Sequence, residues 1–371
     1  MTVIPTRLAA LAAVAGSLIA LPTTAGATPT AAPADATPTL AAASAAPHGT
    51  IATSVVGGPA ASATASDRTA ARVASGWLGR RFVDGTHLTT DYAGTEYDDP
   101  GLTLDAVIAF AATKTNDTRA GRALTWLSDP AQLTFYAGDG TTESYAGAHA
   151  KLVLALQVRA EDPRTFGGRD ILGELAALQR KDGRLSDRSR WGDFSNAFGQ
   201  SLGVVALQRA GLPGGTRAAA YLAGQACPDG GVPILFEQPR CVADLDATAL
   251  AIQAFRAAGR TAAAKAAATW FVASGAVANS NTAGLAAAGL DLVGGRANAR
   301  AADAPRAFIR ARQQACTTPF TRRGAIALDT SGYAASTAPR ATTQAVLGLT
   351  STDLATLTSA GSIAWAPPAR C

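Results

Sequence analysis

Apolar runs of helical length alternate with polar loops along most of the chain, and they come in pairs that repeat about every 45 residues. Near the end of the first run of each pair stands an aromatic or aliphatic residue: Trp77, Trp126, Leu175, Tyr221, Trp270 and Ile309. The second runs can be anchored at Ala109, Ala155, Ala206, Ala254, Gly289 and Gly348. Such self-similarity is typical of stacked copies of one unit that cannot bury its apolar face alone. The pattern therefore predicts six helix pairs.

The two helices of a pair differ in how much of their circumference is apolar. The second helices are apolar on most sides, as in residues 104–112, 152–156, 202–207 and 285–292, so they should be buried. The first helices carry apolar residues on one face and arginines on the other, which suits an outer layer. These arginines are Arg80, Arg81, Arg119, Arg122, Arg169, Arg306, Arg310 and Arg312. The sequence predicts an all-α (α/α)6 toroid of six inner and six outer helices, with an open superhelix as the alternative.

Capping residues place the start of several inner helices. Asp99 should cap one helix, with Pro100 at its first position. Ser195 or Asn196 should cap another, and Asp246 or Thr248 a third, which Gly259 ends.

The N-terminal region has a different composition from the repeats. Residues 1–27 contain one cationic residue, an apolar stretch and a small-residue cleavage signal, which is the pattern of a secretory signal peptide. Residues 28–66 are rich in Ala, Pro and Thr without periodicity, so we expect a flexible linker. Residues 67–371 form the toroid domain. We expect a monomer that is secreted or held in the cell envelope, with no transmembrane segment after cleavage.

Charge and cysteine usage narrow the class of partner. The net charge is +5 over 371 residues, and no Lys/Arg cluster interleaves with aromatic residues along the sequence, so nucleic acid is not an expected partner. The four cysteines lack the short paired spacings of zinc sites, and in a secreted chain they favour disulfides. Of the three possible pairings, proximity favours Cys227 with Cys241 and Cys316 with Cys371.

Three segments resemble the Gln-Trp repeats of terpenoid cyclases: RALTWL at 122–127, LAALQRKDGRLSDRSRW at 175–191 and RAAAYLAGQACPDGG at 217–231. Those repeats occur in squalene and hopene cyclases and, in looser form, in protein prenyltransferase β subunits. The resemblance covers about residues 70–350 and implies an (α/α)6 toroid. Gln225 comes one residue early and no Trp follows Gly231. Vitamin B12 carriers of the transcobalamin type are similar in general plan.

A further segment, DLDATA at 244–249, resembles the Asp-x-Asp-Asp-Thr-Ala motif of class II terpene cyclases, whose middle Asp protonates the substrate. The resemblance implies that Asp246 is the catalytic acid and Asp244 the first carboxylate, while Ala247 replaces the third. The residues alone offer a simpler interpretation, in which Asp244 and Asp246 cap an inner helix and favour its positive end.

In a toroid, all loops that lead from an outer to the next inner helix emerge at one end of the barrel, which we call the mouth. Aromatic and hydrogen-bonding side chains gather in these loops, as is common in ligand sites, whereas the opposite loops are short and plain. The candidate ligand-binding residues are Tyr92, Tyr97, Asp99, Tyr136, Tyr145, His149, Trp191, Phe194, Asn196, Asp246, Asn281 and Tyr333.

We therefore expect a toroid whose role is to bind a ligand at the mouth: an isoprenoid or other lipid, a corrinoid, or a glycan. One alternative is an enzyme, either a cyclase that uses Asp246 or a glycan lyase that uses Tyr145 and His149, which are spaced to share one helix face. Another is an envelope module that binds a second protein. The Asp-x-Cys of prenyltransferase zinc sites and the Cys-Gly-Glu-Gln of thioesters are missing, as are nucleotide-binding motifs. We expect neither metal nor cofactor.

Overall fold

The computed structural model describes residues 62–275 and 277–367, which fold into thirteen helices and two short antiparallel strand pairs. The segment predicted as a signal peptide at 1–27 and nearly all of the segment predicted as a linker at 28–66 lie outside the described residues. The first described helix, α2, begins at Ala65, slightly before the expected boundary at 67. Thr64 and Asp67 form a capping box there, which fixes the start of the helix.

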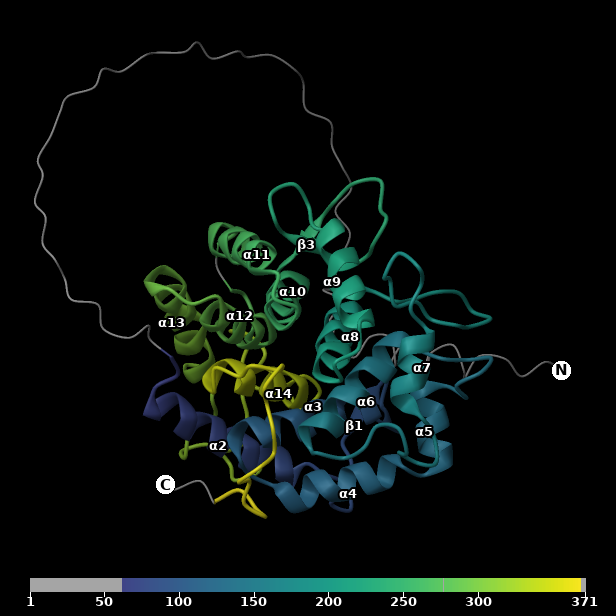
Figure 1. Cartoon of the computed structure of the whole chain (residues 1–371). Coiled ribbons are helices and arrows are strands. Elements are labelled where there is room, and N and C mark those ends of the chain that lie inside the picture. The colour runs from purple at the N-terminus through teal and green to yellow at the C-terminus, as the bar shows by residue number, and fades with distance from the viewer. Residues whose placement is uncertain (1–61, 276, 368–371) are drawn as a thin grey trace, which may run out of the picture. The chain divides into compact units, whose positions relative to one another are not determined.

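Six helices form an inner ring, and each is preceded by an outer helix (Figure 1). The inner helices are α3 (Pro100–Thr113), α6 (Ala146–Val158), α8 (Ala197–Arg209), α10 (Leu245–Ala257), α12 (Ser280–Val293) and α14 (Ala338–Leu349). The outer helices are α2 (Ala65–Arg80), α4 (Asp117–Leu127), α7 (Ile171–Ala177), α9 (Gly214–Gly224), α11 (Thr261–Ala273) and α13 (Arg296–Arg310). Each inner helix packs on the next, and α14 packs back on α3, so the ring is closed. The predicted toroid is confirmed, and the open superhelix is wrong.

Small residues allow the inner helices to approach one another closely. A methyl group on Gly284 of α12 would lie 2.0 Å from the carbonyl oxygen of Gln344 on α14, and one on Gly348 would lie 2.7 Å from the carbonyl oxygen of Gly284. Neither contact is sterically possible. The abundant alanines and glycines of the inner runs therefore serve ring closure.

Three features were not predicted by the repeat pattern. A short helix, α5 (Pro130–Ala137), interrupts the connection between α4 and α6. A hairpin of β1 (Thr89–Tyr92) and β2 (Thr95–Asp98) rises from the connection between α2 and α3. A smaller pair, β3 (Val232–Pro233) and β4 (Ala243–Asp244), brackets the loop before α10. All three lie in connections that lead to the mouth.

The C-terminal segment, residues 350–367, crosses the end of the barrel opposite the mouth. Arg209, at the end of α8, donates to the carbonyl oxygens of Leu354 and Ala355, both at 2.9 Å. Gln253 of α10 bonds the backbone on both sides of Asp353, at 2.8 and 3.2 Å. Leu354 is buried. The segment therefore covers the end of the barrel opposite the mouth. The mouth is the end where the connections that carry α5 and the two strand pairs lie.

The predicted disulfide between Cys227 and Cys241 is present, with the two Cα atoms 5.6 Å apart. The predicted pairing of Cys316 with Cys371 involves a residue outside the described range. Within that range no helix is both long enough and apolar enough to span a membrane.

Candidate ligand site at the mouth

Capping side chains organise the mouth at the N-terminal ends of four inner helices. Asp99 accepts the backbone N–H of Leu102 at the start of α3, at 2.8 Å. Asn196, Asp244 and Asn279 cap α8, α10 and α12 in the same way. These caps bring carboxylate and amide groups to the positive ends of the helix dipoles. Of the two expected alternatives for α8, Asn196 rather than Ser195 is the cap.

The expectation that Asp246 or Thr248 caps α10 is wrong, because Asp244 takes that position. Its carboxylate accepts the N–H of Ala247 at 2.8 Å. Thr248 lies deeper, and its hydroxyl oxygen accepts the N–H of Val232 at 2.8 Å, which ties α10 to β3.

Asp246 is partly buried in the mouth without a cationic partner among the described residues. Its carboxylate accepts a hydrogen bond from the Thr282 hydroxyl on α12. Burial raises the pKa of Asp246 to about 6, and the nearby carboxylate of Asp244 adds to the rise. Near pH 6 this side chain exists in both protonation states, so it can donate as well as accept a proton.

Asp187, in the loop between α7 and α8, is a second carboxyl with a raised pKa that the sequence did not single out. It accepts the backbone N–H groups of Ala146 at 2.7 Å and Phe194 at 3.2 Å, so it fastens that loop to the start of α6. Burial raises its pKa to about 6 despite these bonds. No local sequence signal distinguishes Asp187 from the other acids of polar loops, because its burial depends on packing between distant segments.

His149 is fully buried and has a hydrogen-bond partner at each ring nitrogen. Nδ1 lies 2.9 Å from the carbonyl oxygen of Tyr145, and Nε2 lies 2.8 Å from Glu174 Oε2. Burial raises the pKa of Glu174, but the bonds from His149 and Arg169 outweigh it and bring the pKa to about 2. Both ring nitrogens are therefore engaged, and His149 joins the start of α6 to α7 as a structural group. The Tyr145 hydroxyl donates elsewhere, to Glu143 at 3.2 Å.

The aromatic candidates divide into exposed and buried members. Tyr92, Tyr97, Trp191 and Phe194 expose between 43% and 62% of their surface on the β1–β2 hairpin and the α7–α8 loop. Tyr136 is buried in α5. Burial raises its pKa well above 10, and the charges of Asp105 and Asp99 raise it further. Tyr333 packs edge-on against Trp77, with ring centroids 6.4 Å apart.

The polar candidates other than Asp246 either form hydrogen bonds or ion pairs with neighbouring side chains or are buried. Asp99 accepts the Thr90 hydroxyl at 2.7 Å and lies 3.4 Å from an Arg340 nitrogen. Asn281 is buried in the first turn of α12, and its Oδ1 has no hydrogen-bond partner among the described residues. The mouth thus brings together only part of the predicted set.

Below the mouth, the inner helices surround a small cavity at the barrel axis. The cavity measures about 30 Å³ and is lined by side chains from all six inner helices and by Leu354. Lys151 of α6 lies 2.8 Å from Asp105 of α3 in this layer, and burial raises the pKa of Asp105. Gln344 lines the same cavity without hydrogen bonds from its amide to described residues. A space of this size admits one or two water molecules.

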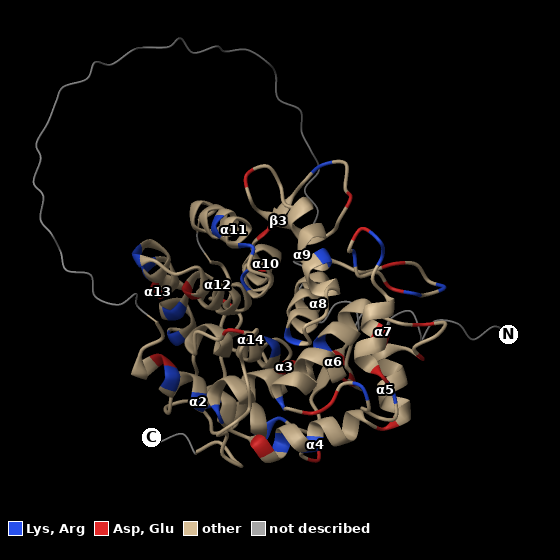
Figure 2. Cartoon of the chain, viewed as in Figure 1, with Lys and Arg blue, Asp and Glu red and all other residues tan. Residues whose placement is uncertain are grey.

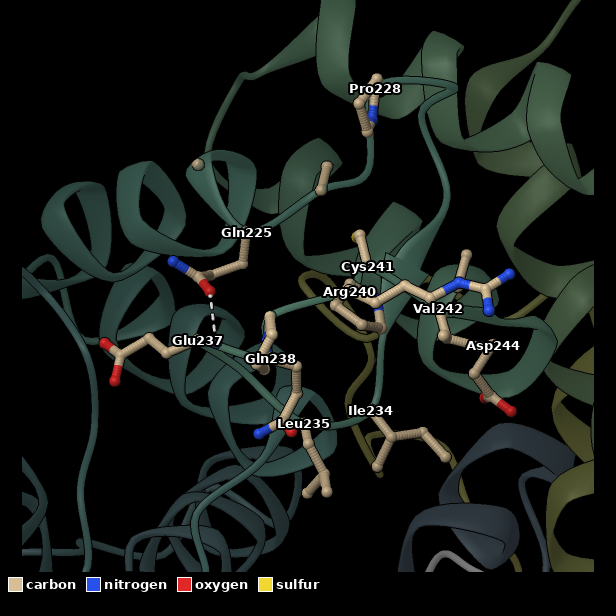
Figure 3. A pocket seen from close by; sticks show the side chains of 15 residues that line it. Gln225, Pro228, Ile234, Leu235, Glu237, Gln238, Arg240, Cys241, Val242 and Asp244 are labelled. Atoms are coloured by element: carbon tan, nitrogen blue, oxygen red, sulfur yellow. Dashed lines mark hydrogen bonds between the residues drawn. The ribbon is translucent and has the colours of Figure 1, made fainter.

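Larger hollows lie between the loops of the mouth. The connection between α9 and α10 forms a groove of about 650 Å³ around the Cys227–Cys241 disulfide (Figure 3). Its wall combines exposed Leu235 and Val242 with polar Glu237 and Arg240. The groove is stiffened by a bond from the Glu237 N–H to Gln225 Oε1, at 3.1 Å. A second hollow of about 380 Å³ lies between the β1–β2 hairpin and residues 335–339.

Comparisons with known proteins support the fold. A protein from Actinoplanes superposes with a TM-score of 0.55 at 16% identity, over 77% of this chain and 99% of the other. An unsaturated glucuronyl hydrolase specific for heparin gives 0.54 at 12% identity, over 78% and 98%. The type II terpene cyclase MstE from Scytonema gives 0.51 at 15% identity, over 77% and 97%. No protein-family model and no curated protein matches the sequence. The chain therefore has an α/α-toroid fold, which these solved structures resemble.

Proposed function

We propose that this protein binds an extended polar ligand, a glycan chain, across the mouth of the toroid and outside the cell. The observation that carries the proposal is a difference in cavity volume. The cavity at the barrel axis measures about 30 Å³, whereas the groove at the mouth measures about 650 Å³. Ligand pockets measure roughly 300–1,000 Å³. The ligand would therefore lie on the mouth and not within the barrel.

The chemistry of the mouth favours a glycan over an isoprenoid or a corrinoid. The exposed rings of Tyr92, Tyr97, Trp191 and Phe194 offer flat faces for sugar rings. Carboxylate and guanidinium groups near these rings can form hydrogen bonds with sugar hydroxyl groups. A purely apolar ligand would remove water from these charged groups without replacing its hydrogen bonds, which costs free energy. Two of the solved toroids, with 12% and 13% identity, are described as unsaturated glucuronyl hydrolases, one of them responsible for glycosaminoglycan degradation. The Cys227–Cys241 disulfide suits a secreted protein.

A second candidate function is acid catalysis on the bound glycan, and Asp246 is the observation that favours it. A partly exposed carboxyl with a pKa of about 6 can protonate a leaving oxygen at mildly acidic pH. A terpene cyclase is less well supported, because cyclisation requires an enclosed chamber and the axis offers little space. The lyase pair receives no support, since both nitrogens of His149 are engaged.

The test is a binding screen of neutral and charged oligosaccharides by isothermal titration calorimetry, with the double variant Trp191→Ala/Tyr97→Ala. Both rings are solvent-exposed, so the variant should fold, and we expect at least tenfold weaker binding of any glycan that the wild type binds. Val272→Ala, an exposed apolar site on outer helix α11, is the control and should bind as the wild type does. Equal affinity of the double variant and the wild type would refute a site that uses these rings.

Turnover of the same glycans decides between the two candidate functions. If the protein only binds, oligosaccharides remain intact after prolonged incubation at pH 5 to 6. If Asp246 acts as an acid, cleavage products appear with the wild type and are lost with Asp246→Asn, while binding persists.

A further inference from the structure

The outer layer carries a cluster of arginines that the linear sequence does not reveal. Arg80 at the end of α2 and both Arg119 and Arg122 on α4 lie close enough to influence one another. Burial lowers the pKa of Arg119, and the charges of Arg122 and Arg80 lower it further. None of the three forms an ion pair within the described parts of the chain. Figure 2 shows basic residues on both helices. The cluster is an unneutralised concentration of positive charge.

An exposed indole completes this cluster, which we call the arginine face: Arg80, Arg119, Arg122 and Trp365. The Trp365 ring is 47% exposed, and the guanidinium carbons of Arg119 and Arg122 lie 4.7 and 5.9 Å from its centroid. Arg80 lies 4.9 Å from the ring centroid of Phe320. Contact with an aromatic ring orients a guanidinium while its N–H groups remain able to bond an anion.

Backbone bonds hold Trp365 in this position. The N–H groups of Asp117 and Thr118, at the start of α4, donate to the carbonyl oxygens of Ile363 and Ala364 at 3.1 and 3.3 Å. The N–H of Ala366 donates to Asn116 Oδ1 at 3.1 Å. The C-terminal segment thus satisfies donors that a helix start leaves free, and it fixes the indole beside the arginines.

The nearby acid does not neutralise the cluster. Asp117 lies in the first turn of α4, but its carboxylate is paired with Arg159. The Arg119 guanidinium donates one bond to Asn116 Oδ1 at 3.1 Å, and Arg80 donates one to the carbonyl oxygen of Arg323 at 2.8 Å. Each guanidinium has five N–H groups, so most of its donors remain available.

We propose that the arginine face is a second binding surface, separate from the mouth, for a polysaccharide that carries sulfate or carboxylate groups. Arginine bonds both groups through two parallel N–H donors, and a bound anion relieves the repulsion among the three like charges. The flat indole edge suits a sugar ring between successive charged groups. A chain of repeating anionic sugars fits a surface whose charges lie on α2 and α4, with Trp365 of the C-terminal segment beside them.

The experiment measures binding of a heparin hexasaccharide and of a polygalacturonate fragment to the full-length chain by calorimetry at 50 and 200 mM salt. We expect saturable binding that weakens with salt. Arg119→Gln/Arg122→Gln should weaken it at least tenfold. The matched control Arg256→Gln/Arg300→Gln removes the same charge from exposed arginines elsewhere and should change affinity less than twofold.

Two further arms keep the outcomes distinct. Arg119→Lys/Arg122→Lys retains the charge but loses the paired donors, and it should bind with intermediate affinity. Equal losses in the glutamine variant and its control would show non-specific attraction and overturn the proposal, as would tighter binding of polyphosphate than of either glycan. The mouth variant Trp191→Ala/Tyr97→Ala should bind the hexasaccharide at this surface unchanged, which separates the two sites.

Discussion

Among single residues, Asp246 links its burial in the mouth to a pH dependence of protein stability that can be measured. Its carboxyl is held next to Asp244 and Thr282, and its pKa is raised from 3.8 to about 6. The folded protein therefore keeps this proton up to about pH 6, whereas the unfolded chain releases it near pH 4. The contribution of this carboxyl to the free energy of unfolding is fully present below pH 4, and it is lost as the pH rises through 6.

Asp246→Asn should stabilise the protein at pH 7.5 and have little effect at pH 4. Asn resembles the protonated carboxyl and retains an oxygen for the Thr282 hydroxyl, so the cost of a buried charge disappears. We expect a gain of about 1–2 kcal/mol in the free energy of unfolding at the higher pH, discounted for partial exposure. Urea denaturation at both pH values measures it. Asp84→Asn, which removes an exposed carboxyl in the connection between α2 and α3, is the control and should show little effect at either pH. A pH-independent effect of Asp246→Asn would contradict the assignment.

The sequence predicted candidate side chains at the mouth but could not predict the environment of each one. Asn196 is a cap, as local pattern implied. Asp244, and not Asp246, caps α10, since alternatives two residues apart are distinguished only by backbone geometry. His149 has its partner, Glu174, on a different helix, and Asp187 is buried by contacts with the start of α6. Long-range packing determines both environments.

On the scale of secondary-structure elements, the connection between α9 and α10 combines a strand pair, a disulfide and a groove of about 650 Å³. The disulfide links residues 14 apart, and closing a loop of this length stabilises a fold by about 3 kcal/mol. Cys227→Ser/Cys241→Ser should lower the free energy of unfolding by about that amount, as measured by urea denaturation without reductant. A loss below about 0.5 kcal/mol would show that the β3–β4 pair alone fixes the loop.

The helices were more predictable than the connections between them. All twelve apolar anchors of the repeat lie in the helices assigned to them, because burial imposes periodicity on the sequence. The helix α5 and the β1–β2 hairpin occupy connections that were expected to be loops. The path of the C-terminal segment was not predicted either, since its bonds to α8 and α10 involve residues distant in sequence.

At the scale of the whole molecule, the inner ring encloses a charged pair near its axis. Lys151 and Asp105 meet at the axis, where removal of one partner leaves a buried charge. Lys151→Met should destabilise the toroid by about 3–5 kcal/mol, whereas Asp105→Leu/Lys151→Met should cost much less than the sum of the two single changes. A denaturation double-mutant cycle measures this coupling. Additive losses would mean that the pair does not interact as described.

The architecture favours the proposed binding at the surface. Residues 350–367 cover the end of the barrel opposite the mouth, and a groove of about 650 Å³ lies between the loops of the mouth. The outer wall adds a differently charged surface at α2 and α4. A single chain could then hold one glycan at its mouth and an anionic polymer on its side.

Hydrogen–deuterium exchange with and without a bound oligosaccharide is the sharpest test of a glycan site at the mouth, because it locates the ligand on the chain. A glycan bound there should slow exchange in residues 89–98, 187–196 and 235–244 and leave exchange in residues 350–367 unchanged. Protection confined to the inner helices and the C-terminal segment would place the ligand inside the barrel and contradict a site at the mouth.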